Sequence, residues 1–148
     1  MRELTARGFT LIEILLSVAL VSIVFGMSYV MYQSVPYQND LDIGVQASRE
    51  LLVEASRYAA ASYDDSEWGV SFVTGTAVLF KGTSYDARDP QFDETIDLFS
   101  ISVSGQNEYV FRKKTGYPTV VGVTTFTSPA TGESKSIDVN EKARINIQ

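Results

Sequence analysis

The sequence contains no histidine and no cysteine among its 148 residues. Without them the chain lacks the commonest general base, thiol nucleophiles, Ser-His-Asp triads and the usual zinc ligand sets. It also lacks a disulfide framework, so redox chemistry argues neither for nor against export. These absences exclude most classes of enzyme, and the length fits a single domain.

Basic residues are also few. Twelve Lys and Arg stand against eighteen Asp and Glu, which gives a formal net charge of −6. A chain of this charge needs a strongly local basic patch to bind phosphate groups, so we do not expect nucleic acid as a main partner. Hydrophobic residues make up 45% of the chain, and they are concentrated near the N-terminus.

The longest apolar run covers residues 9–32, where Glu13 is the one charged residue. A helix of this length spans about 36 Å, enough for the ~30 Å hydrocarbon core of a membrane. Arg2 and Arg7 precede the run, and Asp40 and Asp42 follow it. The positive-inside rule therefore predicts a single-pass protein of the cytoplasmic membrane, with its N-terminus in the cytoplasm and its C-terminal domain outside.

A cleaved secretory signal is a competing interpretation, but such signals end in small residues, whereas residues 31–36 here are Met-Tyr-Gln-Ser-Val-Pro. A plain membrane anchor leaves Glu13 unexplained, because a carboxylate at the bilayer centre costs about 2.5–3.5 kcal/mol. Either Glu13 reaches the aqueous interface, or it needs a cation. Cleavage between Gly8 and Phe9 would create one, the new α-amino group.

The segment Arg7-Gly8-Phe9-Thr10-Leu11-Ile12-Glu13 resembles the class III signal of type IV pilins and type II secretion pseudopilins. In that signal a short basic leader ends in glycine and precedes a long apolar run. The resemblance implies that a prepilin peptidase cuts after Gly8 and methylates Phe9, and that Glu13 pairs with the Phe9 amine of an adjacent subunit. Its implied partners are that peptidase, other pilin or pseudopilin subunits in a homo- or hetero-oligomeric filament, and the inner-membrane assembly platform.

An amphipathic helix is predicted beyond the apolar run. A stripe with alternating spacings of four and three residues would lie on one face and pack on the chain's own domain: Leu41, Val45, Ser48, Leu52, Ala55 and Ala59. Pro36 lacks an amide N–H, and Gly44 is flexible. We therefore expect a helix kink or local melting between Tyr32 and Gly44.

The pattern after Tyr63 alternates and contains many turn residues, which predicts strands. The predicted strands are residues 70–73, 77–80, 99–104, 109–111, 119–126, 136–139 and 144–147. We expect one hairpin to join residues 99–104 to 109–111, and another to cross residues 140–142. Residues 67–70 and 111–118 are similar to the H-type minor pseudopilins.

These elements predict an α+β fold, in which a long N-terminal helix packs on a mostly antiparallel β-sheet domain. The expected divisions are a leader (1–8), a transmembrane or filament-core helix (9–32), an amphipathic helix (33–63) and the β-sheet domain (64–148). The resemblance implies the same pilin-like architecture. It also implies no cofactor.

Two charged clusters are candidate sites in the β domain. Asp86, Asp89 and Asp93 could loop around a calcium ion, but their spacing is not that of an EF-hand, and a solvated acidic loop is the preferred interpretation. Arg112, Lys113 and Lys114 form the basic run, which could contact a ligand such as DNA or could be an exposed turn.

Three functions compete on this evidence. The leading hypothesis is a non-enzymatic structural subunit of a type IV pilus or type II secretion pseudopilus. The alternative is a membrane-anchored adhesin or DNA-binding minor pilin, whose helix only tethers a binding domain. A tethered hydrolase with two carboxylates is the third, and no spacing in the sequence supports it.

Overall fold

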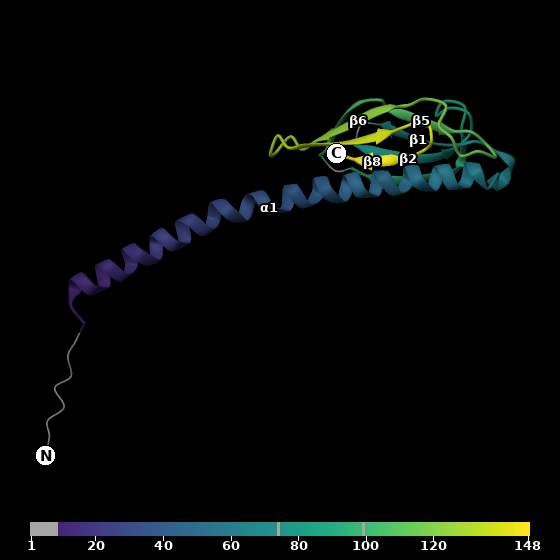
Figure 1. Cartoon of the computed structure of the whole chain (residues 1–148). Helices are drawn as coiled ribbons and strands as arrows, with labels where there is room; N and C mark the ends of the chain where they lie inside the picture. The colour runs from purple at the N-terminus through teal and green to yellow at the C-terminus, as the bar shows by residue number, and fades with distance from the viewer. Residues whose placement is uncertain (1–8, 74, 99) are drawn as a thin grey trace, which may run out of the picture. The chain divides into compact units, whose positions relative to one another are not determined.

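The computed structural model describes residues 9–73, 75–98 and 100–148, and for residues 26–39 it describes the backbone alone. A long helix, α1 (Leu11–Ala60), begins within the N-terminal motif (Figure 1). The chain divides into two compact units, Met1–Pro36 and Tyr37–Gln148, and α1 contributes to both. The helical assignment continues through Pro36 and Gly44, and a kink at these residues stays a prediction.

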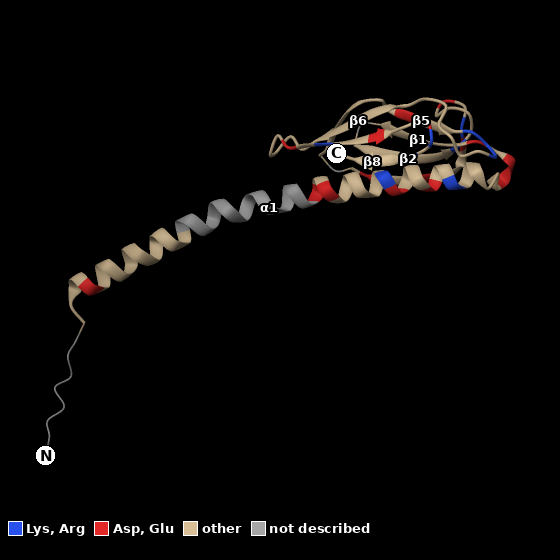
Figure 2. Ribbon diagram, viewed as in Figure 1, with Lys and Arg blue, Asp and Glu red and all other residues tan. Residues whose placement is uncertain are grey.

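The second half of α1 packs on the β domain through the predicted stripe. All six positions are buried, with at most 1% exposure: Leu41, Val45, Ser48, Leu52, Ala55 and Ala59. The hydroxyl of Ser48 donates to the carbonyl of Gly44 at 2.7 Å, so the polar member of the stripe is satisfied. Figure 2 shows the contrast along α1, with one acidic residue in its first part and mixed charges in its second.

The β domain contains two four-stranded sheets among the described residues, and every strand pairing is antiparallel. Sheet A has the order β3-β2-β1-β5, and sheet B has the order β4-β6-β7-β8. The strands are β1 (Trp68–Val73), β2 (Thr76–Lys81), β3 (Asp89–Asp97), β4 (Ser102–Gly105), β5 (Glu108–Phe111), β6 (Gly122–Thr127), β7 (Ser134–Val139) and β8 (Ile145–Ile147). The predicted α+β class is confirmed, and each predicted strand overlaps an observed one.

The predicted hairpin between residues 99–104 and 109–111 is wrong. Strand β4 pairs with β6 in sheet B, whereas β5 pairs with β1 in sheet A, so the turn between them crosses from one sheet to the other. The amide of Gln106 accordingly donates to Val123 in sheet B at 3.0 Å, and Asn107 accepts from Phe72 in sheet A at 2.7 Å. Turn residues indicate that the chain changes direction, but they do not choose the partner strand. The other predicted hairpin, β7 to β8, is confirmed.

Strand β3 was not predicted, because it lies in the stretch interpreted as an acidic loop. Its apolar residues Phe92 and Ile96 are four positions apart, so both point to one face of the strand and pack against the core. The charged residues between them are tolerated because β3 lies at an edge of sheet A, where charge also opposes aggregation. Part of the expected loop is therefore an edge strand.

Aromatic side chains join the two sheets in the core. Phe72 of sheet A meets Phe126 of sheet B edge to face, with ring centroids 5.4 Å apart. The hydroxyls of Tyr109 and Thr124 form a hydrogen bond of 2.9 Å between the sheets. Burial raises the pKa of Tyr109. The helix stripe closes this core on a further side.

Candidate functional site

The N-terminal motif forms the first turn of α1. The helix begins at Leu11, and the carbonyl of Thr10 accepts hydrogen bonds from the amides of Glu13 at 3.1 Å and Ile14 at 3.3 Å. Phe9 is 80% exposed, and Glu13 is also exposed. Gly8, the predicted cleavage position, lies outside the described residues.

The charges and dipoles at the start of α1 offset only part of the cost of keeping the Glu13 carboxylate ionised in an apolar phase. The N-terminus of a helix carries partial positive charge, which stabilises a carboxylate in the first turn by about 0.3–1 kcal/mol. Thr10 and Glu13 also have the spacing of a capping box, a local signal that the prediction of a counter-ion did not use. These terms are smaller than the cost of about 2.5–3.5 kcal/mol for a carboxylate in an apolar phase. Glu13 still needs a cation if α1 enters such a phase.

The residues that follow Glu13 present an apolar surface. Every described side chain from Phe9 to Phe25 is exposed. The hydroxyls of Ser17 and Ser22 donate to carbonyls four residues earlier, at 2.7 and 2.8 Å, and so need no water. Exposed apolar surface on this scale marks a place where another apolar surface binds.

In the part of the chain that the structure describes, no helix holds a stretch that is both long and apolar enough to cross a membrane. Residues 26–32 of the predicted span belong to the range without described side chains.

The basic run closes the C-terminal end of α1 (Figure 2). The amide of Lys114 donates to the carbonyl of Ala59 at 2.9 Å, which satisfies one of the free carbonyls of the last turn. Lys113 pairs with the carboxylate of Asp65 at 2.6 Å, and its hydrogen bond lowers the pKa of Asp65. Cations near a helix C-terminus also complement its dipole. The run therefore has a structural role, while the side chains of Arg112 and Lys114 remain exposed.

Two of the three carboxylates considered for calcium have other partners. Asp93 pairs with Arg88 at 2.8 Å, and Asp89 opens strand β3 and accepts a hydrogen bond from the amide of Gln91 at 3.2 Å. Asp86 is exposed. The described residues contain no group of three or more acidic side chains placed to hold a metal ion.

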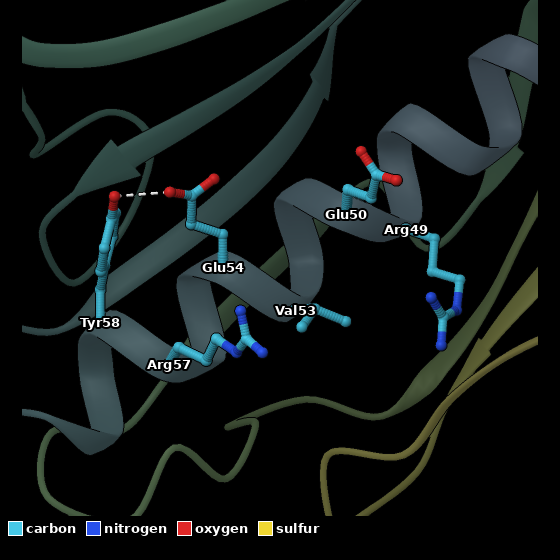
Figure 3. A pocket seen from close by; sticks show the side chains of 6 residues that line it. All are labelled: Arg49, Glu50, Val53, Glu54, Arg57 and Tyr58. Atoms are coloured by element: carbon cyan, nitrogen blue, oxygen red, sulfur yellow. Dashed lines mark hydrogen bonds between the residues drawn. The ribbon is translucent and has the colours of Figure 1, made fainter.

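A hollow of about 310 Å³ lies on α1 within the β-domain unit (Figure 3). Its lining residues all come from this one helix: Arg49, Glu50, Val53, Glu54, Arg57 and Tyr58. The hydroxyl of Tyr58 donates to Glu54 at 2.5 Å, and this bond to a carboxylate raises the pKa of Tyr58 to about 12. A tyrosine that holds its proton so firmly is a poor general base.

A family model and a solved structure are similar to parts of this chain. The model for the prokaryotic N-terminal methylation motif matches residues 5–29. The minor pseudopilin EpsH from the Type 2 Secretion System of Vibrio cholerae has a similar fold, with a TM-score of 0.58. The match covers 74% of this chain and 96% of that chain at 10% identity, so the likeness concerns the fold. No curated protein sequence matches the chain.

The methylation motif starts the long helix, and the pseudopilin fold follows it in the same chain. The chain thus combines the prokaryotic N-terminal methylation motif with a fold similar to that of a minor pseudopilin.

Proposed function

We propose that the chain is a structural subunit of a type IV pilus or type II secretion pseudopilus. It is made as a prepilin, cleaved after Gly8, N-methylated at Phe9 and assembled through its N-terminal helix. The fold shared with EpsH, a protein of the Type 2 Secretion System, favours the secretion pseudopilus.

The observation that carries this proposal is the first part of α1. Residues 9–25 are apolar except for Glu13, serines and Thr10, and all are exposed. A carboxylate in such a surface is costly alone but becomes favourable when another subunit supplies its counter-ion. The Phe9 amine created by cleavage is a cation of suitable size at the start of the same helix.

The proposal includes a membrane stage. The subunit first lies in the cytoplasmic membrane, with its N-terminus in the cytoplasm and the β domain outside, as the charges around the apolar run predict. A prepilin peptidase then processes it, the inner-membrane platform receives it, and neighbouring pilin or pseudopilin subunits surround its helix. The β domain needs no cofactor for this role.

The N-terminal peptide of protein recovered from producing cells tests the processing step. Mass spectrometry is expected to find N-methylated Phe9 as the first residue. Retained Met1, or cleavage after Ser34, would contradict the proposal and favour an anchored adhesin or DNA-binding protein.

Assembly is tested with Glu13→Ala, scored by the amount of processed subunit that enters filaments. The variant is expected to insert and be cleaved, but to enter filaments at least about a hundredfold less, because removing one partner of a buried pair leaves the other charge uncompensated at a cost of about 3–5 kcal/mol. Ser17→Ala, one turn further along, is the matched control and should assemble normally. Normal incorporation of Glu13→Ala would remove the counter-ion argument.

A further inference from the structure

We propose that the β domain carries two complementary margins, through which one copy of this chain contacts the next copy head to tail. The basic margin comprises residues 112–121, and the acidic margin comprises Asp86, Asp89 and Glu94 in and before β3. This contact adds to the helix-based assembly described above, and it rests on that proposed function.

The basic margin is the outermost layer on one side of sheet A. Residues 117–119 run beside β5, where Pro118 forms a bridge to Phe111. This layer leaves large apolar side chains open to solvent, each about half exposed: Tyr117 at 51%, Val120 at 46% and Val121 at 48%. Arg112 and Lys114 lie beside them, are exposed, and form no ion pair with any described residue. Apolar residues next to unpaired cations fit a protein surface that is acidic and partly apolar.

The acidic margin is the opposite side of the same sheet. Strand β3 pairs with β2 and forms an edge of sheet A. Asp86, Asp89 and Glu94 are exposed, and none forms an ion pair within the described residues. Arg88, the cation between them in sequence, is already paired with Asp93 at 2.8 Å. Asp89 and Glu94 therefore form no ion pair among the described residues of the β domain, whereas Asp86 lies close enough to Arg88 for its charge to raise the pKa of that guanidinium.

The two margins also lie at the same level along the strands. One row of partners crosses sheet A from Asp89 to Lys81, Trp68, Phe111 and Pro118. Because Asp89 and Pro118 end the same row, Asp89 and Arg112, the residue after Phe111, lie near one end of the sheet. Glu94 lies further along the strands, in the row of Leu79, Val70 and Tyr109. A second copy displaced sideways would bring Asp89 close to the level of Arg112 without any shift along the strands.

A contact between two different surfaces suits a filament. Such a heterologous contact leaves one margin of each copy free, so repetition produces an open chain of subunits. Exposed ion pairs contribute little affinity and are screened by salt. The margins would therefore align subunits that the helices already hold together, and they would select the orientation of the β domains.

Cysteine cross-linking tests this contact, because the full-length chain contains no cysteine of its own. Glu94→Cys and Val120→Cys are placed together in one full-length chain, expressed in cells that assemble filaments, and oxidised with copper phenanthroline. We expect a ladder of covalent oligomers. The same two changes in separate, co-expressed chains should give dimers and no ladder, and either change alone should give at least tenfold less product.

A matched control replaces Glu94→Cys with Glu141→Cys, an exposed residue in the β7–β8 turn, and should give no ladder. Added to the chain that carries Glu94→Cys and Val120→Cys, Arg112→Glu should lower the yield of covalent oligomers several-fold. Adding Asp89→Lys as well should restore that yield. The amount of processed subunit in filaments is measured in the same samples. Normal incorporation without a ladder would overturn this inference alone, whereas an unprocessed N-terminus would overturn the proposed function as well.

Discussion

Gly116 lies where the basic turn meets α1, and its replacement tests whether this contact holds the turn in place. Its φ is +64°, and a Cβ at this position would lie 2.6 Å from the carbonyl oxygen of Ser56 and 2.9 Å from the Cβ of Ala60. The carbonyl of Gly116 also accepts a hydrogen bond of 2.9 Å from the hydroxyl of Ser56. A methyl group therefore meets helix backbone, which cannot rotate away.

The expected magnitude has two parts. An alanine in the left-handed region costs about 1–2 kcal/mol, and the collision with the helix adds about 1–3 kcal/mol of overpacking. Gly116→Ala should thus destabilise the β domain by about 2–5 kcal/mol. Gly132→Ala is the matched control, because Gly132 has a φ of +74° but nothing within 4 Å of an added Cβ. Gly132→Ala should destabilise the β domain only by the conformational cost of about 1–2 kcal/mol.

Urea unfolding of the detergent-solubilised full chain measures both variants. Trp68 is the one tryptophan, is 2% exposed, and packs on Tyr58 near the end of α1 at a centroid distance of 4.9 Å, so its fluorescence reports on this region. A loss of about 3 kcal/mol lowers the unfolding midpoint by roughly 1–3 M urea. Equal shifts for Gly116→Ala and Gly132→Ala would show that the turn moves freely, and would refute the reasoning.

Two further predictions concern the helix that supports the β domain. Because the pKa of Tyr58 is raised to about 12 by its bond to Glu54, whereas an unfolded tyrosine titrates near 10, stability should be complete below pH 10 and fall as the pH rises toward 12. Circular dichroism of urea unfolding should show a shallower fall in Tyr58→Phe; an equal fall would contradict the assignment. Leu52→Ala, at 0% exposure, should cost about 2–5 kcal/mol, whereas Ile43→Ala, at 52% exposure, should change stability by less than about 0.5 kcal/mol. Thermal unfolding compares the two, and a small loss for Leu52→Ala would count against the packing of the stripe.

The stripe on α1 could be predicted because a single helix specifies its own periodicity. The positions from Leu41 to Ala59 depend only on the angle between successive residues, and all of them are buried as expected. Strand partners are a different problem, since they depend on contacts between distant segments. The turn between β4 and β5 has suitable residues for a hairpin, yet Gln106 bonds to Val123 and Asn107 bonds to Phe72.

The charged residues considered as candidate sites show the same difference between local pattern and contacts made by the fold. Arg112, Lys113 and Lys114 were recognised as a basic run, but their role at the end of α1 comes from a backbone amide that meets Ala59 across the fold. No composition or spacing rule reveals such a contact. Likewise, the partner of Asp93 is Arg88, which lies between Asp86 and Asp89 in the sequence.

The distribution of ion pairs supports an assembly role for the first part of α1. All four ion pairs among the described residues lie within the β-domain unit: Lys81 with Asp64, Arg88 with Asp93, Lys113 with Asp65, and Lys135 with Asp42. Glu13 belongs to none of these pairs, although its apolar surroundings give it the greatest need of a counter-ion. Four cations of the β domain thus have partners inside it, whereas under the proposed function Glu13 takes its cation from cleavage or from a neighbour. A subunit with this division gains most from a partner at its N-terminal helix, which is the contact on which filament assembly depends.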